Sequence, residues 1–386
     1  MGVTVAADVE SLDDLARLPF SVKDDLRAHY PFGLLAVDRE ELVRVHASSG
    51  TGGKPTVVGY TRADLEAWTD VMARSLRTAG LRPGMVAHNA NGYGLFTGGL
   101  GFHQGAERVG ATVVPASGAG TTRHVTLLCD LGAHALFATP SYALRIGQAV
   151  ADAGLGPGDL ALEVGMFGGE PWSRRLGAEI ERLLGLMAVN VYGLSEIVGP
   201  GVAVQCLEVR DGLHVNEDHF LVEVVDPESG TALRAGEEGE LVFTTLAKEG
   251  LPLLRYRTGD VAALQSGPCA CGRTLARITP VRGRTDDMLI VRGVNLYPSE
   301  IEATLLAVDG VAPHYQIVVE RPGALDELTV HCEPAADGID RDALAARLAE
   351  ALRERTGVRI GVSLLDRGAV PRSEGKAVRV VDRRAL

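Results

Sequence analysis

One short segment, residues 48–56 (SSGTGGKPT), combines the residue types that hold a polyanion. Its glycines let backbone N–H groups turn toward an anion, and its hydroxyls and one ammonium add further donors. The segment therefore predicts a loop that holds the phosphates of a nucleotide, with a flexible Gly/Ser loop as the alternative. A Walker A loop is excluded, because Ser48 stands where that motif needs its first glycine and Pro55 follows Lys54.

Two further motifs follow apolar runs that read as strands: GGEPW at residues 168–172 and YGLSE at residues 192–196. The carboxyl ends of parallel strands are where α/β sheets bind ligands. Tyr192 could stack on a purine, and Glu196 could hold Mg²⁺ against phosphate oxygens. Taken alone, each motif is equally typical of an ordinary turn.

Three motifs in the last third complete the set: YRTGD at 256–260, RGRTDDMLIVRG at 282–293 and PRSEGK at 371–376. Asp260 follows a glycine, and such an acidic side chain can accept both hydroxyls of a ribose, as the acidic residue does in dinucleotide-binding folds. The last motif presents a single lysine between a proline and an expected strand. Each of the six motifs is weak by itself, but six in this order are specific.

Together the motifs resemble the adenylate-forming superfamily of acyl-CoA synthetases, adenylation domains and luciferases. GYGLFTGGLG, YGLSEIVGPGVA, EDHF, RGRTDDMLIVRGVNLYPSEIE and PRSEGKA are similar to the phenylacetate-CoA ligase branch, from about residue 11 to the C-terminus. The resemblance implies ATP-dependent activation of a small aromatic carboxylic acid to an acyl-adenylate. It implies Mg²⁺ as cofactor and coenzyme A as the second substrate, and it is compatible with a homodimer.

The resemblance also implies roles for single residues. Lys376 would be the catalytic lysine of a mobile C-terminal domain, Asp286 the hinge of that domain, and Glu196 a catalytic residue at the magnesium. Gly52 departs from the branch, which usually has a second threonine there, and this predicts weaker ATP binding. The segment before the phosphate loop is also expected to be shorter than in relatives.

For the nucleotide, the resemblance places the adenine at Glu170 and Tyr192, the ribose hydroxyls at Asp260, and Arg284 near the ribose and phosphate. The full ATP-binding set that it implies is Ser48, Ser49, Gly50, Thr51, Gly53, Lys54, Gly169, Glu170, Pro171, Tyr192, Gly193, Ser195, Asp260 and Arg284.

The acyl pocket is expected between residues 92–105 and 191–201. Two of its members, His103 and Gln104, are polar where a phenylacetate pocket would be apolar. This favours an aryl acid with a hydroxyl or amino substituent, and the alternative is that Gln104 faces a helix neighbour. The expected lining is Tyr93, Phe96, Phe102, His103, Gln104, Gly193 and Pro200.

A second kind of site is expected in the β-rich region, because a C-x-C-G turn presents two sulfurs to one tetrahedral ion. Some members of the branch carry a Cys/His zinc site here, so a structural zinc is predicted. An ideal two-residue hairpin at residues 211–212 would put two of the ligands on opposite faces, so another turn is required. The alternative is a core cysteine and a reduced surface loop. The predicted zinc ligands are Cys206, His214, Cys269 and Cys271.

The elements that position these motifs alternate between strand and helix from residue 61 to about 199, which predicts a mostly parallel α/β sheet. Strand and turn signals dominate from there to about 285, and a small α+β pattern follows. The predicted fold is therefore α/β. A large N-terminal domain (1–285) contains a β-rich subdomain at about 200–285, and a small mobile domain (286–386) carries the catalytic lysine.

Composition narrows the partners of the 386-residue chain. A net charge of −12 and a pI of about 5.4 argue against nucleic acid and acidic membranes. An acidic N-terminal stretch argues against secretion. Five cysteines at irregular spacing suit a reducing cytoplasm, with Cys129 and Cys332 expected in the core.

Two other functions fit the same motifs. One is an aryl-acid adenylating enzyme of a biosynthetic pathway, part of secondary metabolism, that passes the acyl group to an amine, a carrier-protein thiol or another nucleophile. The other is a non-catalytic nucleotide-binding protein with the same fold. The presence of both Lys376 and Glu196 argues against the second, because a binding module needs no mobile lysine.

Overall fold

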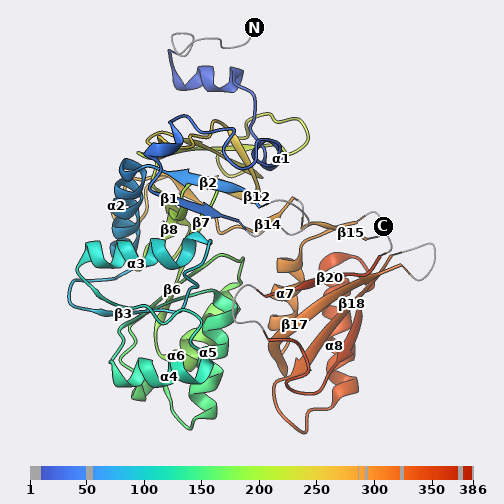
Figure 1. The fold of residues 1–386 in the computed structure, drawn as a ribbon. Helices are drawn as coiled ribbons and strands as arrows, with labels where there is room; N and C mark the ends of the chain where they lie inside the picture. The colour runs from blue at the N-terminus through green and yellow to red at the C-terminus, as the bar shows by residue number, and fades with distance from the viewer. Residues whose placement is uncertain are drawn as a thin grey trace.

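The computed structural model describes residues 10–48, 55–285, 287–291, 294–321, 326–372 and 377–384. These residues form a larger N-terminal domain and a smaller C-terminal domain that lie side by side (Figure 1). Within the described residues, no helix is both long and apolar enough to cross a membrane.

A twelve-stranded sheet runs through the larger domain. One half is parallel and is flanked by helices, as the alternating pattern predicts. Its strands are β3 (Val86–Asn89), β4 (Thr112–Val114), β5 (Ala135–Ala138), β6 (Val164–Gly168) and β7 (Met187–Leu194). Its helices are α2 (Arg62–Thr78), α3 (Thr97–Val109), α4 (Thr121–Asp130), α5 (Pro140–Asp152) and α6 (Arg174–Leu184).

The other half of the sheet is antiparallel and continues the first without a break, because β7 pairs with β8. Gly193 makes this junction possible: a Cβ there would lie 2.0 Å from the Gly199 carbonyl oxygen. The β-rich region is thus an extension of the parallel sheet. Its strands are β8 (Gly199–Gln205), β9 (Leu213–Val215), β10 (Phe220–Val225), β11 (Glu238–Thr245), β12 (Tyr256–Gln265), β13 (Arg277–Ile278) and β14 (Gly283–Arg284).

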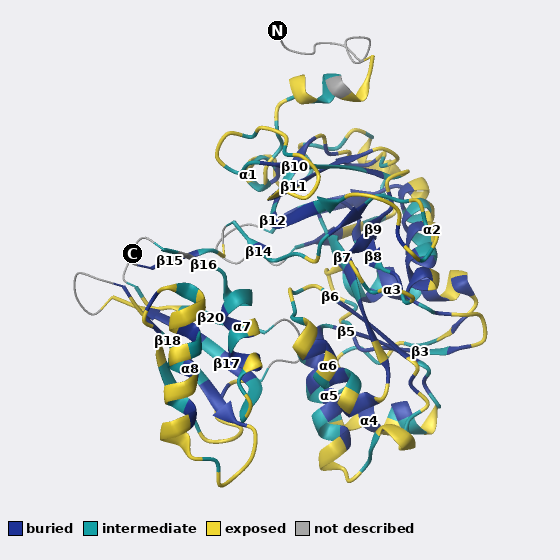
Figure 2. Ribbon diagram, turned by 180° about the vertical axis from the view of Figure 1, so that it is seen from behind, coloured by how far each residue is buried: buried dark blue, intermediate teal, exposed yellow. Residues whose placement is uncertain are grey.

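Local signals set the helix ends where they are strong. Helix α2 begins with a reciprocal cap: the Thr61 hydroxyl accepts from the Asp64 N–H, and the Asp64 carboxylate accepts from the Thr61 N–H. The helix then buries Trp68 against α3 and β8, where its indole N–H donates to the Pro200 carbonyl. Buried side chains follow the strands and the inner helix faces, while the outer faces are exposed (Figure 2).

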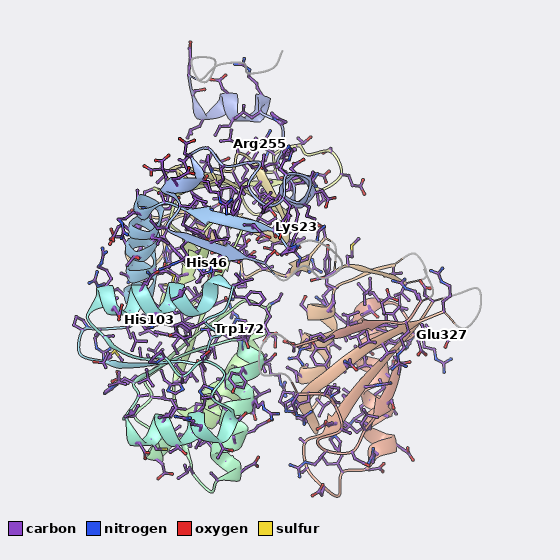
Figure 3. All side chains as sticks on the ribbon, viewed as in Figure 1. Lys23, His46, His103, Trp172, Arg255 and Glu327 are labelled. Atoms are coloured by element: carbon purple, nitrogen blue, oxygen red, sulfur yellow. The ribbon has the colours of Figure 1, made fainter. Side chains whose placement is uncertain are left out.

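The N-terminal segment lies at the end of the larger domain opposite α4 (Figure 1). It contains the 3₁₀ helices η2 (Leu12–Arg17) and η3 (Arg39–Glu41), helix α1 (Lys23–Ala28), and the hairpin of β1 (Arg44–Ala47) and β2 (Val57–Tyr60). Arg255, labelled in Figure 3, attaches this segment to the rest of the larger domain. Its buried guanidinium donates to the carbonyls of Ala16 (3.1 Å) and Leu18 (2.9 Å), pairs with Glu223, and stacks over Phe20 at 4.1 Å.

The smaller domain has a two-stranded ribbon and a four-stranded sheet of order β19-β18-β17-β20, against which two helices pack. Cys332 lies fully buried in this core as expected, whereas Cys129 on α4 is only half-buried, which corrects its assignment to the core. The elements are β15 (Leu289–Val291), β16 (Val294–Leu296), α7 (Pro298–Ala307), β17 (Val311–Glu320), β18 (Glu327–Pro334), α8 (Arg341–Thr356), β19 (Gly361–Leu364) and β20 (Val380–Asp382).

Candidate nucleotide, acyl and metal sites

Three residues from three different strands meet at the Asp260 carboxylate. The Tyr192 hydroxyl of β7 donates to Asp260 Oδ2 at 2.7 Å, and Arg284 of β14 donates to Asp260 Oδ1 at 2.8 Å. Burial raises the pKa of Tyr192 well above its ordinary value and the Asp260 charge raises it further, so the phenol stays protonated and donates. Three residues of the expected nucleotide set are therefore brought together, with the Tyr192 ring resting near Phe243.

The expected magnesium residue, Glu196, lies in the turn after β7 and is 5% exposed. Its carboxylate accepts from the Thr56 hydroxyl at 3.0 Å and lies 3.5 Å from Lys23 Nζ. Thr56 ends the phosphate motif, and its hydroxyl also contacts that of Ser48. The first and last residues of the motif thus lie near Glu196. The hydroxyl of the preceding residue, Ser195, forms a hydrogen bond with the Thr97 hydroxyl.

Lys248 is a functional candidate that sequence reasoning missed. Its ammonium donates to the carbonyls of Glu196 (3.2 Å) and Ile197 (2.7 Å), and it lies 5.0 Å from the centre of the Tyr60 ring. Burial lowers the pKa of Lys248 to about 7, although the charges of Asp64 and Glu196 act in the opposite direction. Lys248 therefore fixes the backbone that carries Glu196, and only its position before the YRTGD motif could have drawn attention to it.

The loop after β6 holds Glu170, the second residue expected at the adenine, and its carboxylate contacts both domains. Glu170 accepts from the backbone N–H of Ser141 (2.7 Å) and from that of Ala377 in the smaller domain (2.9 Å). Its neighbours Gly169 and Pro171 are exposed. Trp172, on the side of the larger domain that faces the smaller one, packs against the α5 and α6 core (Figure 3).

The two polar residues expected in the acyl pocket already have partners. The Gln104 side-chain carbonyl accepts from Arg44 at 2.9 Å. His103 Nδ1 lies 3.0 Å from the Tyr93 hydroxyl, and His103 Nε2 lies 3.1 Å from Glu107. The preference for hydroxy- or amino-substituted acids assumed polar groups without partners, so that premise does not hold. The alternative partner considered for Gln104 was a helix neighbour, and the observed one is a strand residue.

The remaining expected pocket residues surround the junction of α3 with β8. Phe102 is buried and stacks on Phe137 with ring centres 4.9 Å apart, whereas Phe96, which directly precedes α3, is exposed. Helix and strand touch closely, since a Cβ on Gly101 would lie 2.8 Å from the Pro200 ring. Gly193 faces the same junction from β7.

Part of the expected machinery lies outside the described residues. These are Ser49, Gly50, Thr51, Gly52, Gly53 and Lys54 of the phosphate loop, the hinge Asp286, and the lysine Lys376.

The four predicted zinc ligands converge, with their donor atoms all within 4.8 Å of one another. Cys206 Sγ lies 3.8 Å from Cys269 Sγ, and Cys271 Sγ lies 3.5 Å from His214 Nε2. Bonds of about 2.3 Å to sulfur and about 2.0–2.1 Å to nitrogen in a tetrahedral zinc site give edges of about 3.8 and 3.5 Å. The donor set and its spacing therefore fit zinc.

The required turn is a seven-residue connection, because β8 ends at Gln205 and β9 begins at Leu213. Cys206 follows the strand directly, and its carbonyl accepts from the N–H of Arg210, which has a φ of 53°. His214 pairs with Val204 in the ladder. Side chains alternate between the two faces of a sheet only within its strands. Because Cys206 lies in the loop after β8, its side chain can reach the same face as that of His214.

Comparison with known proteins identifies the family to which this chain belongs. Residues 4–246 match the family described as AMP-binding enzyme, and residues 293–384 match the AMP-binding enzyme C-terminal domain. The chain belongs to the AMP-binding enzymes. Within them it falls in the phenylacetate-CoA ligase branch. It is 52% identical to the phenylacetate-coenzyme A ligase of Thermus thermophilus, over 97% of this chain and 88% of that protein. It is 47% identical to the ligase of the same name from Pseudomonas putida, over 98% and 86%.

Among solved structures, this AMP-binding enzyme is similar to a 2-hydroxyisobutyryl-CoA ligase seen in two states. In its postadenylation state with an acyl-AMP, that protein matches with a TM-score of 0.91 at 31% identity, over 97% of this chain and 82% of that one. In its thioesterification state with CoA, it matches with a TM-score of 0.71 at 32% identity, over 98% and 83%.

Proposed function

We propose that the protein is an AMP-forming aryl-acid:CoA ligase. It joins a small aromatic carboxylic acid to the AMP moiety of ATP and then transfers the acyl group to coenzyme A. The observation that carries the proposal is the Asp260 carboxylate held by Tyr192 and Arg284 in a chain 52% identical to a phenylacetate-CoA ligase. This carboxylate is suitably fixed to accept ribose hydroxyls.

In the first half-reaction the substrate carboxylate attacks the α-phosphorus of ATP, and pyrophosphate leaves. Positioning and charge stabilisation supply most of the rate in such a transfer. We assign charge stabilisation to Lys376 and to the phosphate loop, and the seating of the nucleoside to Tyr192, Asp260 and Arg284. Glu196 and the Thr56 hydroxyl are hard oxygen ligands that fit Mg²⁺, which would neutralise phosphate charge when bound.

In the second half-reaction the thiol of coenzyme A attacks the acyl-adenylate, and AMP leaves. We propose that the division between the domains lies at residues 285 and 286, with Asp286 as the hinge. Rotation about the hinge would withdraw Lys376 and admit the thiol. The similarity to the postadenylation state rather than the thioesterification state of one relative supports assigning the present arrangement to the first half-reaction.

For the acid, phenylacetate is the substrate that we favour. The relatives named for it cover nearly the whole chain, and the polar groups near α3 that argued for substituted acids are already paired. We further propose one structural zinc ion bound by the four-residue cluster. Transfer to an amine or to a carrier-protein thiol remains the second candidate for the acceptor.

The test is a pyrophosphate-release assay over a panel of aryl acids, with and without coenzyme A. We expect the release to depend on phenylacetate and to turn over repeatedly with coenzyme A, and phenylacetyl-CoA to accumulate. An adenylate that forms but does not react with coenzyme A would select the second candidate. No adenylate from any aryl acid would refute the proposal.

A further inference from the structure

The two domains meet through a polar contact at the loop after β6. One carboxylate oxygen of Glu170, in the larger domain, accepts a hydrogen bond from the Ser141 N–H at the start of α5. The other oxygen accepts from the Ala377 N–H of the smaller domain. Arg379, two residues further on, donates to the Ser141 hydroxyl at 3.2 Å. The Glu170 side chain thus connects the beginning of α5 to the segment between the PRSEGK motif and β20.

A second carboxylate makes a reciprocal contact from the smaller domain. Glu302 on α7 is 4% exposed, and one of its oxygens accepts from Ser173 N of the larger domain at 3.1 Å. Its other oxygen accepts from the Tyr315 hydroxyl at 2.9 Å. Beside it, Leu306 of α7 is buried in the hydrophobic cluster formed mainly by α5 and α6. The contact therefore combines buried apolar area with two fully engaged carboxylates.

We propose that Glu170 and Glu302 are positioning residues for adenylate formation, which hold the smaller domain in the arrangement required by the first half-reaction. The inference rests on the proposed function. Three observations support it: each carboxylate bridges the two domains, the apolar contact at Leu306 accompanies them, and the whole structure matches one relative far better after adenylation than during thioester formation.

Substitution by glutamine has different consequences at the two carboxylates, because their hydrogen-bond partners differ. Both partners of Glu170 are backbone N–H groups, which only donate, so the amide nitrogen introduced by Glu170→Gln would face a donor and one bond would be lost. One partner of Glu302 is a phenol, which can accept as well as donate. A glutamine there keeps both contacts by accepting from Ser173 N and donating to Tyr315, whereas an alanine loses both.

The test measures the half-reactions separately in Glu170→Gln, Glu302→Ala and Glu302→Gln. Phenylacetate-dependent pyrophosphate release reports the first, and thioester formation from supplied phenylacetyl-adenylate and coenzyme A reports the second. We expect Glu170→Gln and Glu302→Ala to lose about tenfold or more in kcat of adenylation, the loss typical of a hydrogen bond to a charged group. The KM for ATP and the thioester step should stay within about twofold of wild type.

Two variants serve as controls. Glu302→Gln should retain the adenylation rate, because it keeps both hydrogen bonds and loses only the long, 3.9 Å ion pair with Arg379. Asp309→Asn removes the 3.1 Å ion pair with Arg175 across the same domain boundary, but Asp309 is 93% exposed, so it should have little effect. Small-angle X-ray scattering of the unliganded proteins gives a readout independent of chemistry. Glu170→Gln and Glu302→Ala should scatter differently from wild type, and both controls should not.

Equal loss of both half-reactions in Glu302→Ala, or unchanged adenylation in both Glu170→Gln and Glu302→Ala, would overturn the proposal. Identical scattering from all five proteins would also overturn it. If wild type forms no adenylate from any aryl acid, the proposed function fails by itself, and the scattering comparison decides whether the two carboxylates hold the domains together.

Discussion

Removal of the proposed zinc ion from the Cys/His cluster should lower the thermal stability of the protein without unfolding it. The cluster joins the end of β8 to β9 and to the C-x-C turn before β13, so an ion there crosslinks three segments that pair only through short ladders. At about a thousand times its Kd, a bound ion contributes about 4 kcal/mol to the free energy of unfolding. For 386 residues unfolding in one step, the unfolding entropy is about 0.8 kcal/mol/K. Loss of the ion should therefore lower Tm by about 5 °C.

The assay is differential scanning calorimetry before and after dialysis against a strong chelator, with elemental analysis of both samples. We expect about one zinc per chain before dialysis, and a Tm that zinc restores when it is added back. Cys271→Ser should show the lower Tm at once and should not respond to the chelator. Cys129→Ser is the matched control, because Cys129 is a half-buried cysteine outside the cluster. Zinc-free purified protein, or a chelator shift below about 1 °C, would refute the reasoning.

Three further predictions concern the nucleotide site. Lys376→Ala should reduce adenylate formation by about 100-fold or more while sparing thioester formation from supplied acyl-adenylate, and equal loss of both steps would contradict it. Asp260→Asn removes the negative charge that pairs with Arg284 and leaves only one oxygen to accept from the ribose hydroxyls, so it should raise the KM for ATP about 10- to 100-fold in steady-state assays; an unchanged KM would argue that Asp260 does not hold the nucleotide. Because burial lowers the pKa of Lys248 to about 7, the unfolded chain binds a proton there between pH 7 and about 10.5 that the folded chain has lost. The free energy of unfolding from urea titrations should thus gain a rising contribution over this pH range, and Lys248→Met should remove it; identical slopes would contradict the assignment.

Those parts of the fold that depend on local signals could be predicted. The alternating helix and strand patterns from residue 61 to about 199 predicted the parallel half of the sheet with its helices, and the elements from α2 to β7 lie at residues 62–194. The continuity of the sheet could not be predicted in this way. It depends on β8 pairing back on β7 at Gly193, and nothing in the composition of either strand distinguishes a hairpin within one sheet from the start of a new one.

The same distinction applies to the candidate site. Asp260 and Tyr192 were identified through motifs, and the structure brings them together although 68 residues separate them. Lys248 lies in no motif, because a lysine that binds two carbonyls leaves no pattern in the sequence. Glu302 ends the motif RGRTDDMLIVRGVNLYPSEIE, but the motif does not show that its carboxylate accepts from a backbone N–H of the larger domain. Gln104 shows the converse error: its polarity was visible, but its partner on β1 was not.

The attachment of the N-terminal segment by Arg255 has a consequence for how the protein is made. The guanidinium that holds the Leu18 carbonyl follows it by 237 residues in the chain. At a synthesis rate of about 5–20 residues per second, the ribosome needs roughly 10–50 s to reach this arginine after the segment has been made. During that interval the carbonyls of Ala16 and Leu18 lack the guanidinium that binds both of them in the folded protein. The part of the segment around these two residues can therefore reach its final attachment only after Arg255 has been translated.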